Sequence, residues 1–387
     1  MNMNHLLDQF AEIFQPEGKI HTCFAPGRVN LIGEHTDYNG GHVFPCALSF
    51  GTYGIASKRE DKKLRFYSEN FKHLGIIETD IENIVYDTNH NWANYPKGII
   101  KTFQEAGYKI DEGLELFFYG NIPNGAGLSS SASIELVTSI ILSVIFELEI
   151  DKIEMIKLSQ KSENEFNGVN CGIMDQFACG MGKKDHAILL DTHTLYYEYV
   201  PLKLQGISIV IANTNKRRDL AVSKYNERRN ECERALRALQ QELEIVSLGD
   251  LTEYIFEQNQ YLIKDEIERK RAKHAIYENQ RTIKAVKALS HGHILRFGEL
   301  MNESHVSLRD DYEVTGVELD TLVSAAWRNG AIGARMTGAG FGGCTVSLVH
   351  EKDLDTFIQR VGKEYADKIG YPAAFYVAST DDGAREI

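Results

Sequence analysis

Residues 25–41 read APGRVNLIGEHTDYNGG. Glycines flank four polar side chains that fall within ten positions of one another, namely Arg28, Glu34, His35 and Asp37. Burying so many polar groups is costly unless each has a partner. The stretch therefore favours a ligand rich in hydroxyl groups, held by side chains on a loop, with Arg28 available to an anion. A Glu-His-x-Asp set could instead bind a metal, although no further set of protein ligands is evident.

A second glycine-rich stretch, NIPNGAGLSSSAS at residues 121–133, follows a β-rich run and precedes a long helical pattern. It lacks the lysine of the GxxxxGK[ST] loop and is not a loop of that kind. Its chemistry is still that of anion binding, because glycines allow close approach and a helix N-terminus attracts phosphate. Hydroxyl groups for phosphate oxygens or Mg²⁺ come from Ser129, Ser130 and Ser131. The stretch could also be a serine-capped helix after a tight turn.

Composition narrows the class of protein. A chain of 387 residues is too long for one ordinary hydrophobic core, which favours two domains. Its net charge of −13 argues against broad nucleic-acid binding. Six cysteines show no CxxC or zinc-like spacing, which is typical of a reduced intracellular protein. Residues 1–14 predict a short amphipathic helix rather than a signal peptide. We expect a cytoplasmic protein that binds neither membrane nor nucleic acid, and no obligate protein partner is evident.

The periodicity of apolar residues predicts an α+β chain. Strands are expected on both sides of Pro26-Gly27, as a pair over 43–59, and over 114–120, 344–350 and 373–380. Helices are expected over 131–148, 153–167, 222–240, 265–290, 318–330 and 353–370. We place a domain boundary near residue 200, which gives an N-terminal domain of residues 1–200 and a C-terminal domain of residues 201–387.

Three motifs together resemble those of the galactokinase family. GRVNLIGEHTDYNGG resembles the galactokinase signature, and PNGAGLSSSAS resembles the second motif of the wider galacto-, homoserine, mevalonate and phosphomevalonate (GHMP) kinase superfamily. The third motif is MTGAGFGG at residues 336–343, which could close over the phosphates or be a simple strand turn. The resemblance implies a two-domain α+β GHMP kinase fold with the active site in the cleft between the domains. ATP would lie over the glycine-serine loop, and galactose against the signature.

The resemblance also implies a catalytic pair. Asp175, in NCGIMDQ at residues 170–176, matches the family's catalytic aspartate, a general base toward the C1 hydroxyl of galactose. Arg28 matches the arginine that stabilises the transferred phosphoryl group and keeps Asp175 ionised. How far the proton leaves before transfer stays open, because loose phosphoryl-transfer transition states need little activation of the nucleophile. Without the resemblance, Asp175 could simply cap a helix after the NCG turn.

Binding residues follow from the same motifs. The implied sugar-contacting residues are Glu34, His35, Thr36, Asp37, Gly172 and Tyr225. The implied nucleotide-contacting residues are Ser68, Gly125, Ala126, Gly127, Leu128, Ser129, Ser130 and Ser131. Ser131 and Glu163 match the Mg²⁺-binding positions. Two of these have an ordinary alternative, since Ser68 could be an exposed turn serine and Tyr225 a routine aromatic residue of an amphipathic helix.

The implied reaction is the ATP-dependent phosphorylation of galactose to galactose 1-phosphate, the first step of galactose metabolism. One alternative is a related kinase acting on N-acetylgalactosamine or arabinose. Another is a galactose sensor without catalysis, acting through a partner protein. A sensor need not keep the arginine, the aspartate and the phosphate loop, and this chain has all three.

Overall fold

A six-stranded sheet organises the N-terminal half of the computed structural model, which describes residues 3–123, 126–216 and 221–387. The strand order is β13-β1-β3-β6-β4-β5, and the pairs are antiparallel except β4 with β6. The strands are β1 (Ile20–Asn30), β3 (Pro45–Lys58), β4 (Lys63–Ser68), β5 (Ile77–Asp80), β6 (Leu114–Gly120) and β13 (Arg385–Glu386). Aromatic and branched residues such as those of β6, LELFFYG, suit a buried pleated surface.

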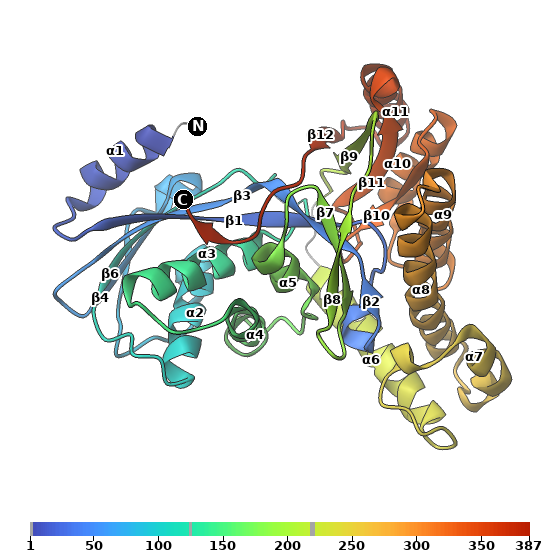
Figure 1. The fold of residues 1–387 in the computed structure, drawn as a ribbon, viewed down its shortest axis with the longest axis horizontal. Coiled ribbons are helices and arrows are strands. Elements are labelled where there is room, and N and C mark those ends of the chain that lie inside the picture. The colour runs from blue at the N-terminus through green and yellow to red at the C-terminus, as the bar shows by residue number, and fades with distance from the viewer. Residues whose placement is uncertain (1–2, 124–125, 217–220) are drawn as a thin grey trace.

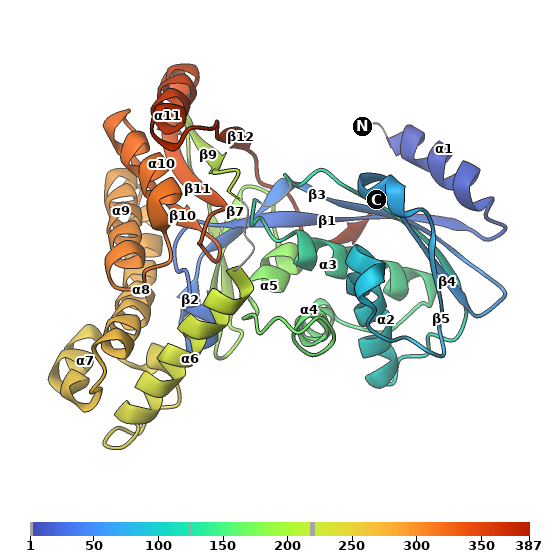
Figure 2. The same cartoon turned by 180° about the vertical axis from the view of Figure 1, so that it is seen from behind.

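Helices cover both faces of this sheet (Figure 1). On one face, α1 (Met3–Phe14) packs Leu6, Phe10 and Phe14, one helical turn apart, against Ile55 and Phe117. The other face carries the helices that lead toward the site (Figure 2). These are α2 (Asn94–Glu105), α3 (Ser130–Ile145), α4 (Lys152–Lys161) and α5 (Met174–Met181), with a π-helical turn at Ser162–Phe166 after α4.

The C-terminal half is built on a four-stranded antiparallel sheet of order β10-β11-β9-β12. Its strands are β9 (Ile207–Asn213), β10 (Gly333–Thr337), β11 (Cys344–His350) and β12 (Ala374–Ala378). Its helices are α6 (Ala221–Leu239), α7 (Glu253–Asn259), α8 (Glu266–Ser290), α9 (Ile294–Asp310), α10 (Gly316–Arg328) and α11 (Leu354–Ile369). Alternate residues of β9 face opposite cores, because Ile209 and Ile211 pack toward α9 whereas Val210 and Ala212 pack toward α10 and α11.

A hydrophobic core joins the two halves. Val29, Leu31 and Phe44 from the N-terminal half pack in one cluster with Ile211 and Val346 of the C-terminal sheet. A small sheet of β2 (His42–Val43), β7 (His186–Asp191) and β8 (Tyr197–Pro201) lies beside this junction. The junction holds residues 31–41, the loop after β1, against the C-terminal half.

The sequence predicted most of these elements and misjudged some. The strand over 114–120 is confirmed, and the helices over 131–148 and 153–167 are confirmed with shifted ends. The two strands expected around Pro26-Gly27 are one strand, because β1 continues through them with a register shift between Pro26 and Arg28. The pair expected over 43–59 is mainly the single long strand β3. Strand β13 returns to the N-terminal sheet from beyond residue 200, so elements cross the expected domain boundary.

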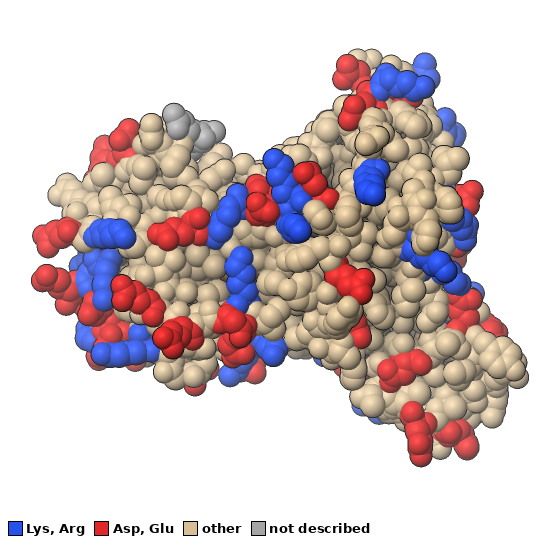
Figure 3. All heavy atoms as spheres, viewed as in Figure 1, with Lys and Arg blue, Asp and Glu red and all other residues tan. Residues whose placement is uncertain are grey.

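Charged side chains of both signs are interspersed over the face shown in Figure 3, as expected for a modestly acidic surface. Across the described ranges, no helix combines the length and apolar character that a membrane crossing requires.

Candidate active site

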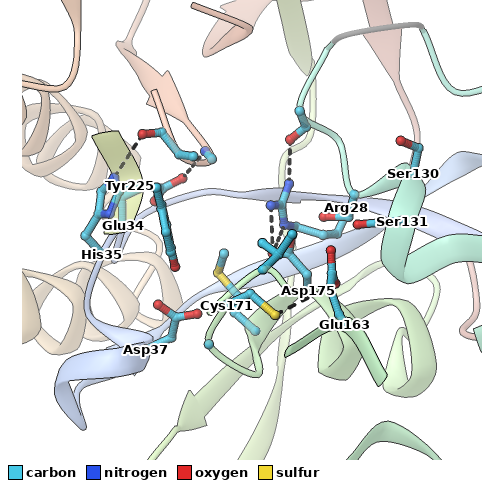
Figure 4. A pocket seen from close by; sticks show the side chains of 17 residues that line it. Arg28, Glu34, His35, Asp37, Ser130, Ser131, Glu163, Cys171, Asp175 and Tyr225 are labelled. Carbon is cyan, nitrogen blue, oxygen red and sulfur yellow. Dashed lines mark hydrogen bonds and ion pairs between the residues drawn. The ribbon is translucent and has the colours of Figure 1, made fainter. Parts of the chain in front are cut away.

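A cavity of about 270 Å³ lies where the two halves meet. Figure 4 shows Arg28 and Asp175 in its middle, with Glu34, His35 and Tyr225 on one side and Ser130, Ser131 and Glu163 on the other. The N-terminal half contributes the loop after β1, the start of α3 and the start of α5, whereas α6 and the glycine loop after β10 come from the C-terminal half. The lining residues are Arg28, Glu34, His35, Asp37, Gly127, Ser129, Ser130, Ser131, Glu163, Val169, Cys171, Gly172, Met174, Asp175, Tyr225, Gly338 and Ala339.

An ion pair between Arg28 and Asp175 forms the centre of the site. Nε of Arg28 donates to Asp175 Oδ1 at 2.8 Å, and Nη2 lies 2.7 Å from the same oxygen. Nη1 of Arg28 donates to the carbonyl oxygen of Gly127 at 2.9 Å, which ties the arginine to the phosphate loop. Burial alone would lower the pKa of Arg28, but the Asp175 carboxylate more than offsets this and the pKa lies above its ordinary value. The arginine therefore stays charged between the carboxylate and the loop.

Asp37 lines the side of the cavity that also holds Glu34, His35 and Tyr225. Burial, and then the nearby Asp175 carboxylate, raise the pKa of Asp37 to about 6. A side chain at Gly172 would place its Cβ 2.0 Å from Asp37 Oδ2, so only glycine lets these two segments approach so closely. Tyr225, on α6, lies with its ring 5.6 Å from His35. Helix α6 is held in place by Arg228, whose Nε donates to Tyr312 O at 2.8 Å.

His35 already has partners for both ring nitrogens. Nδ1 lies 2.8 Å from the Tyr38 hydroxyl and Nε2 lies 3.2 Å from Ala339 O, so the ring donates from Nε2 and accepts at Nδ1. Burial lowers the pKa of His35 to about 3, which keeps the ring neutral. Thr36 does not line the cavity, because its side chain is buried and its hydroxyl lies 2.8 Å from Gly33 O and 2.7 Å from His42 O. These hydrogen bonds give Thr36 a role in shaping the loop after β1.

Glu34 links the signature to the third motif. Its Oε1 accepts from Thr337 Oγ1 at 3.1 Å and from the Gly338 amide at 2.7 Å. Its Oε2 accepts from Asn30 and forms an ion pair of 2.8 Å with Arg335 Nη2. Glu34 and Arg335 are both buried, so each charge depends on the other. The glycine loop after β10 also approaches the phosphate loop, because a Cβ at Gly338 would lie 3.2 Å from Gly127 O.

One side of the phosphate loop packs into the core and the other side faces the cavity. Ala126 and Leu128 are buried with their side chains in the core, and Leu128 O accepts from the Arg28 amide at 3.2 Å. Gly127 and the three serines line the cavity, whereas Gly125 lies outside the described residues. Ser129 has a left-handed backbone with φ of 63° immediately before α3, and its buried hydroxyl has no partner within the described part of the chain. Such an unpaired donor beside a helix N-terminus suits a bound anion.

Acidic groups gather behind the serines. Burial raises the pKa of Glu163 to about 7, although a hydrogen bond from Ser131 acts in the opposite direction. Gln176 Nε2 donates to Glu163 Oε2 at 2.5 Å and to Glu135 Oε2 at 3.1 Å. The described residues contain no group of three or more His, Cys, Asp or Glu side chains arranged for a metal. Mg²⁺ is usually held by one or two carboxylates and substrate phosphates, so Glu163 and Ser131 fit this ion.

A second cavity of about 560 Å³ opens beyond Ser130 and Ser131 and is rich in aromatic side chains. Ser68 lines it and is buried, so the alternative of an exposed turn serine is wrong. Phe71 and Trp92 stack there with an interplanar angle of 17°. Flat apolar walls next to a phosphate loop suit the base of a nucleotide.

Several site residues were missed by the sequence reasoning. Glu135 is the one charged residue of α3, and Gln176 follows Asp175 in the short helix α5, so only their complete burial marks them as important. Trp92 and Tyr95 belong to a run of asparagine and aromatic residues, NHNWANY at residues 89–95, which could have indicated a binding surface. Cys171 lines the main cavity, although we predicted only that it is an unpaired thiol.

Comparison with known proteins first defines the class. Residues 94–183 match the N-terminal domain of GHMP kinases and residues 285–367 their C-terminal domain, so the chain is a GHMP kinase. A mevalonate kinase of Methanococcus jannaschii, 20% identical, has the same fold, with a TM-score of 0.66 over 95% of this chain and 99% of its own. Residues 8–58 match the galactokinase galactose-binding signature.

The particular family follows from closer relatives. The chain is 59% identical to galactokinases of Fusobacterium nucleatum and Clostridium beijerinckii, over 100% of this chain and 100% and 99% of theirs. The crystal structure of Lactococcus lactis galactokinase complexed with galactose is 50% identical and has a TM-score of 0.98 over the whole of both chains. The chain belongs to the galactokinase family and is an ATP-dependent sugar kinase. The predicted family and the two-domain α+β kinase fold are confirmed.

Proposed function

We propose that this enzyme transfers the γ-phosphoryl group of ATP to the C1 hydroxyl of galactose. The observation that carries the proposal is the Arg28–Asp175 pair, which lies between a cavity wall of sugar-binding character and the phosphate loop. The relatives at 59% identity are galactokinases, and the Lactococcus lactis relative binds galactose. The substrate, the position of phosphorylation and the roles of the site residues are parts of this proposal.

Asp175 accepts the proton of the C1 hydroxyl as the oxygen attacks phosphorus. Nη2 of Arg28 lies 2.7 Å from Asp175 Oδ1, and the contact of Arg28 with Gly127 directs the guanidinium group toward the phosphate loop. There the positive charge stabilises the oxygens of the transferred phosphoryl group. The positioning of the two substrates supplies much of the rate, because the transition state is loose.

The other residues hold the substrates. Asp37 and the Gly172 backbone accept and donate hydrogen bonds to sugar hydroxyls, and Tyr225 covers the sugar from α6. Glu34 contributes mainly by fixing the wall, since both of its carboxylate oxygens already have protein partners. Gly127, Ser129 and Ser130 bind the ATP phosphates, and the cavity with Ser68 and Trp92 accepts the adenine base. Glu163 and Ser131 would hold Mg²⁺, which supplies neutralisation of phosphate charge.

The cellular location and the partners of the enzyme belong to the same proposal. All six cysteines are unpaired, as in proteins of reducing compartments, which supports a cytoplasmic location. The reaction needs only galactose, ATP and Mg²⁺, and the site is complete within one chain, so we propose that no obligate protein partner is required.

The experiment is a coupled assay of ADP release with galactose, N-acetylgalactosamine, arabinose and glucose, with the phosphorylated position determined by NMR. We expect galactose 1-phosphate as the product. Asp175→Ala should lower kcat by roughly 10²-fold or more, the low end for loss of a general base, while galactose still binds. Phosphate at C6, or near-normal turnover of folded Asp175→Ala, would contradict the proposal. Galactose binding without ADP release would favour the sensor.

A further inference from the structure

The last nine residues, 379–387, form a strap that connects the two halves of the molecule (Figure 1). The strap leaves β12 in the C-terminal sheet and ends in β13, which pairs with β1 in the N-terminal sheet. On its way it contacts β3, where the Ser49 amide donates to Ser379 O at 2.9 Å and the Asp381 amide donates to Ala47 O at 3.2 Å. These contacts give the strap a fixed path across the junction.

The middle of the strap is attached to α5. The Gly383 amide donates to Gly182 O at 2.8 Å, and the Ala384 amide donates to Cys179 O at 2.9 Å. Ala384 is fully buried in the core of the N-terminal half. Helix α5 runs from Met174 to Met181 and carries Asp175 in its first turn. A helix of eight residues moves largely as one body, so contacts at its C-terminal end affect the position of Asp175.

The end of the strap is attached to β1. Phe24 pairs with Arg385 in register, and the guanidinium group of Arg385 lies 5.1 Å from the centre of the Phe24 ring. The Ile387 amide donates to Thr22 O at 2.9 Å. Strand β1 carries Arg28. The strap is thus attached to both elements that carry the central ion pair, the helix with Asp175 and the strand with Arg28.

We infer that the strap is a positioning element that sets the distance between Arg28 and Asp175. Within the described residues, no hydrogen bond of the strap reaches a lining residue of the cavity, so its effect passes through α5 and β1. The inference rests on the catalytic roles proposed for Arg28 and Asp175. If those roles hold, loosening the strap slows the chemical step, because misplacement by about 1 Å can cost on the order of 10²-fold in rate.

Gly383 offers a precise way to disturb the strap. A Cβ at Gly383 would lie 2.2 Å from Gly180 O on α5, far below the 3.4 Å of ordinary contact. Gly383→Ala therefore has to move either the strap or the end of α5 by about 1 Å, a displacement that matters to a catalytic pair. We expect kcat to fall by about 10- to 100-fold, with KM for galactose and for ATP within about threefold of the parent, since the binding residues lie on other elements.

The matched control is Val361→Ala, which removes methyl groups from the core beneath α11 in the C-terminal half. It should lower Tm without changing kcat at a temperature where it is folded. If Val361→Ala lowers kcat as much as Gly383→Ala at equal loss of Tm, the effect is one of general stability and the inference is wrong. Unchanged kcat in folded Gly383→Ala overturns it as well.

Ala384→Gly serves if Gly383→Ala does not fold, because it removes one buried methyl group and adds no clash. We then expect a smaller loss, about three- to tenfold in kcat, again with KM unchanged. A normal kcat in Ala384→Gly overturns the inference in that case. Failure of the proposed function would look different, since the unaltered enzyme would then release no ADP with galactose.

Discussion

On the proposed function, the single buried residue Asp37 should make sugar binding depend on pH. Its pKa is raised to about 6, first by burial and then by the neighbouring Asp175. Above that pH the carboxylate is ionised and, in its proposed role, can accept hydrogen bonds from the sugar. Below that pH the carboxyl group is protonated, so the free energy of removing the proton weakens the observed binding of the sugar. Affinity for galactose should therefore be constant above about pH 7 and fall by up to about tenfold per pH unit below the pKa.

The measurement is isothermal calorimetry of galactose binding between pH 5 and 8, without ATP or Mg²⁺, so that only the sugar is bound. Asp37→Asn should bind galactose more weakly at every pH and show a nearly flat profile. If the unaltered enzyme binds equally well at pH 5 and pH 8, Asp37 does not accept hydrogen bonds from the sugar in its ionised form.

The residues that sequence could identify are those in dense motifs. Arg28, Asp37 and the serines of the phosphate loop stand out because charge and glycine are concentrated around them, and all line the cavity. The partners of these residues could not be found in this way. Arg335 supports Glu34 from a position about 300 residues later in the chain, and nothing near it in sequence indicates that its side chain is fully buried. Such long-range pairs depend on tertiary packing.

At the scale of elements, the proposed function predicts that the close contact between β1 and the phosphate loop positions ATP. A Cβ at Gly27 would lie 2.5 Å from Leu128 O, next to the amide of Arg28 that donates to the same oxygen. Gly27→Ala should push the loop away from β1 and misalign the amides and serines that bind phosphate. We expect KM for ATP to rise by about tenfold or more and KM for galactose to change by less than about threefold.

Steady-state kinetics with each substrate varied in turn test this expectation. Gly362→Ala is the matched control, because the same methyl group in α11 meets only the ring of Phe375 at 3.2 Å, far from the site. A Gly27→Ala enzyme with unchanged KM for ATP would show that the loop does not depend on this close approach.

Sequence patterns predicted long elements better than short ones. Helices over 131–148 and 265–290 have many apolar positions and clear ends, and both are present. Helix α5 was not predicted as a helix, because its eight residues, MDQFACGM, give too few turns for a periodic signal. Strand β1 was divided at Pro26-Gly27, where the chain instead passes through a bulge at the edge of the phosphate loop. The short helix α5 and the bulge in β1, where the sequence pattern is irregular, are thus the segments that build the site.

At the scale of the whole molecule, the site depends on contact between the halves. The cluster around Val29, Phe44 and Val346 is continuous across the junction, and the strap of residues 379–387 joins the two sheets a second time. The walls of the cavity come from both halves, with Asp37 from one and Tyr225 from the other. A ligand that contacts both walls should therefore stabilise the folded state as a whole, since unfolding of either half destroys its binding site.

Galactose at 100 times its Kd should raise the free energy of unfolding by about 2.7 kcal/mol, the value expected for a ligand that binds only the folded state. The measurement is urea unfolding followed by circular dichroism, with and without the sugar. On the proposed function, glucose at the same concentration should stabilise far less, because its epimeric C4 hydroxyl leaves a buried acceptor of the pocket without its partner. Asp37→Ala should lose most of the effect of galactose. Equal stabilisation by both sugars would show that the cavity does not distinguish the C4 hydroxyl, and the choice of galactose over glucose would have to arise in the transfer step.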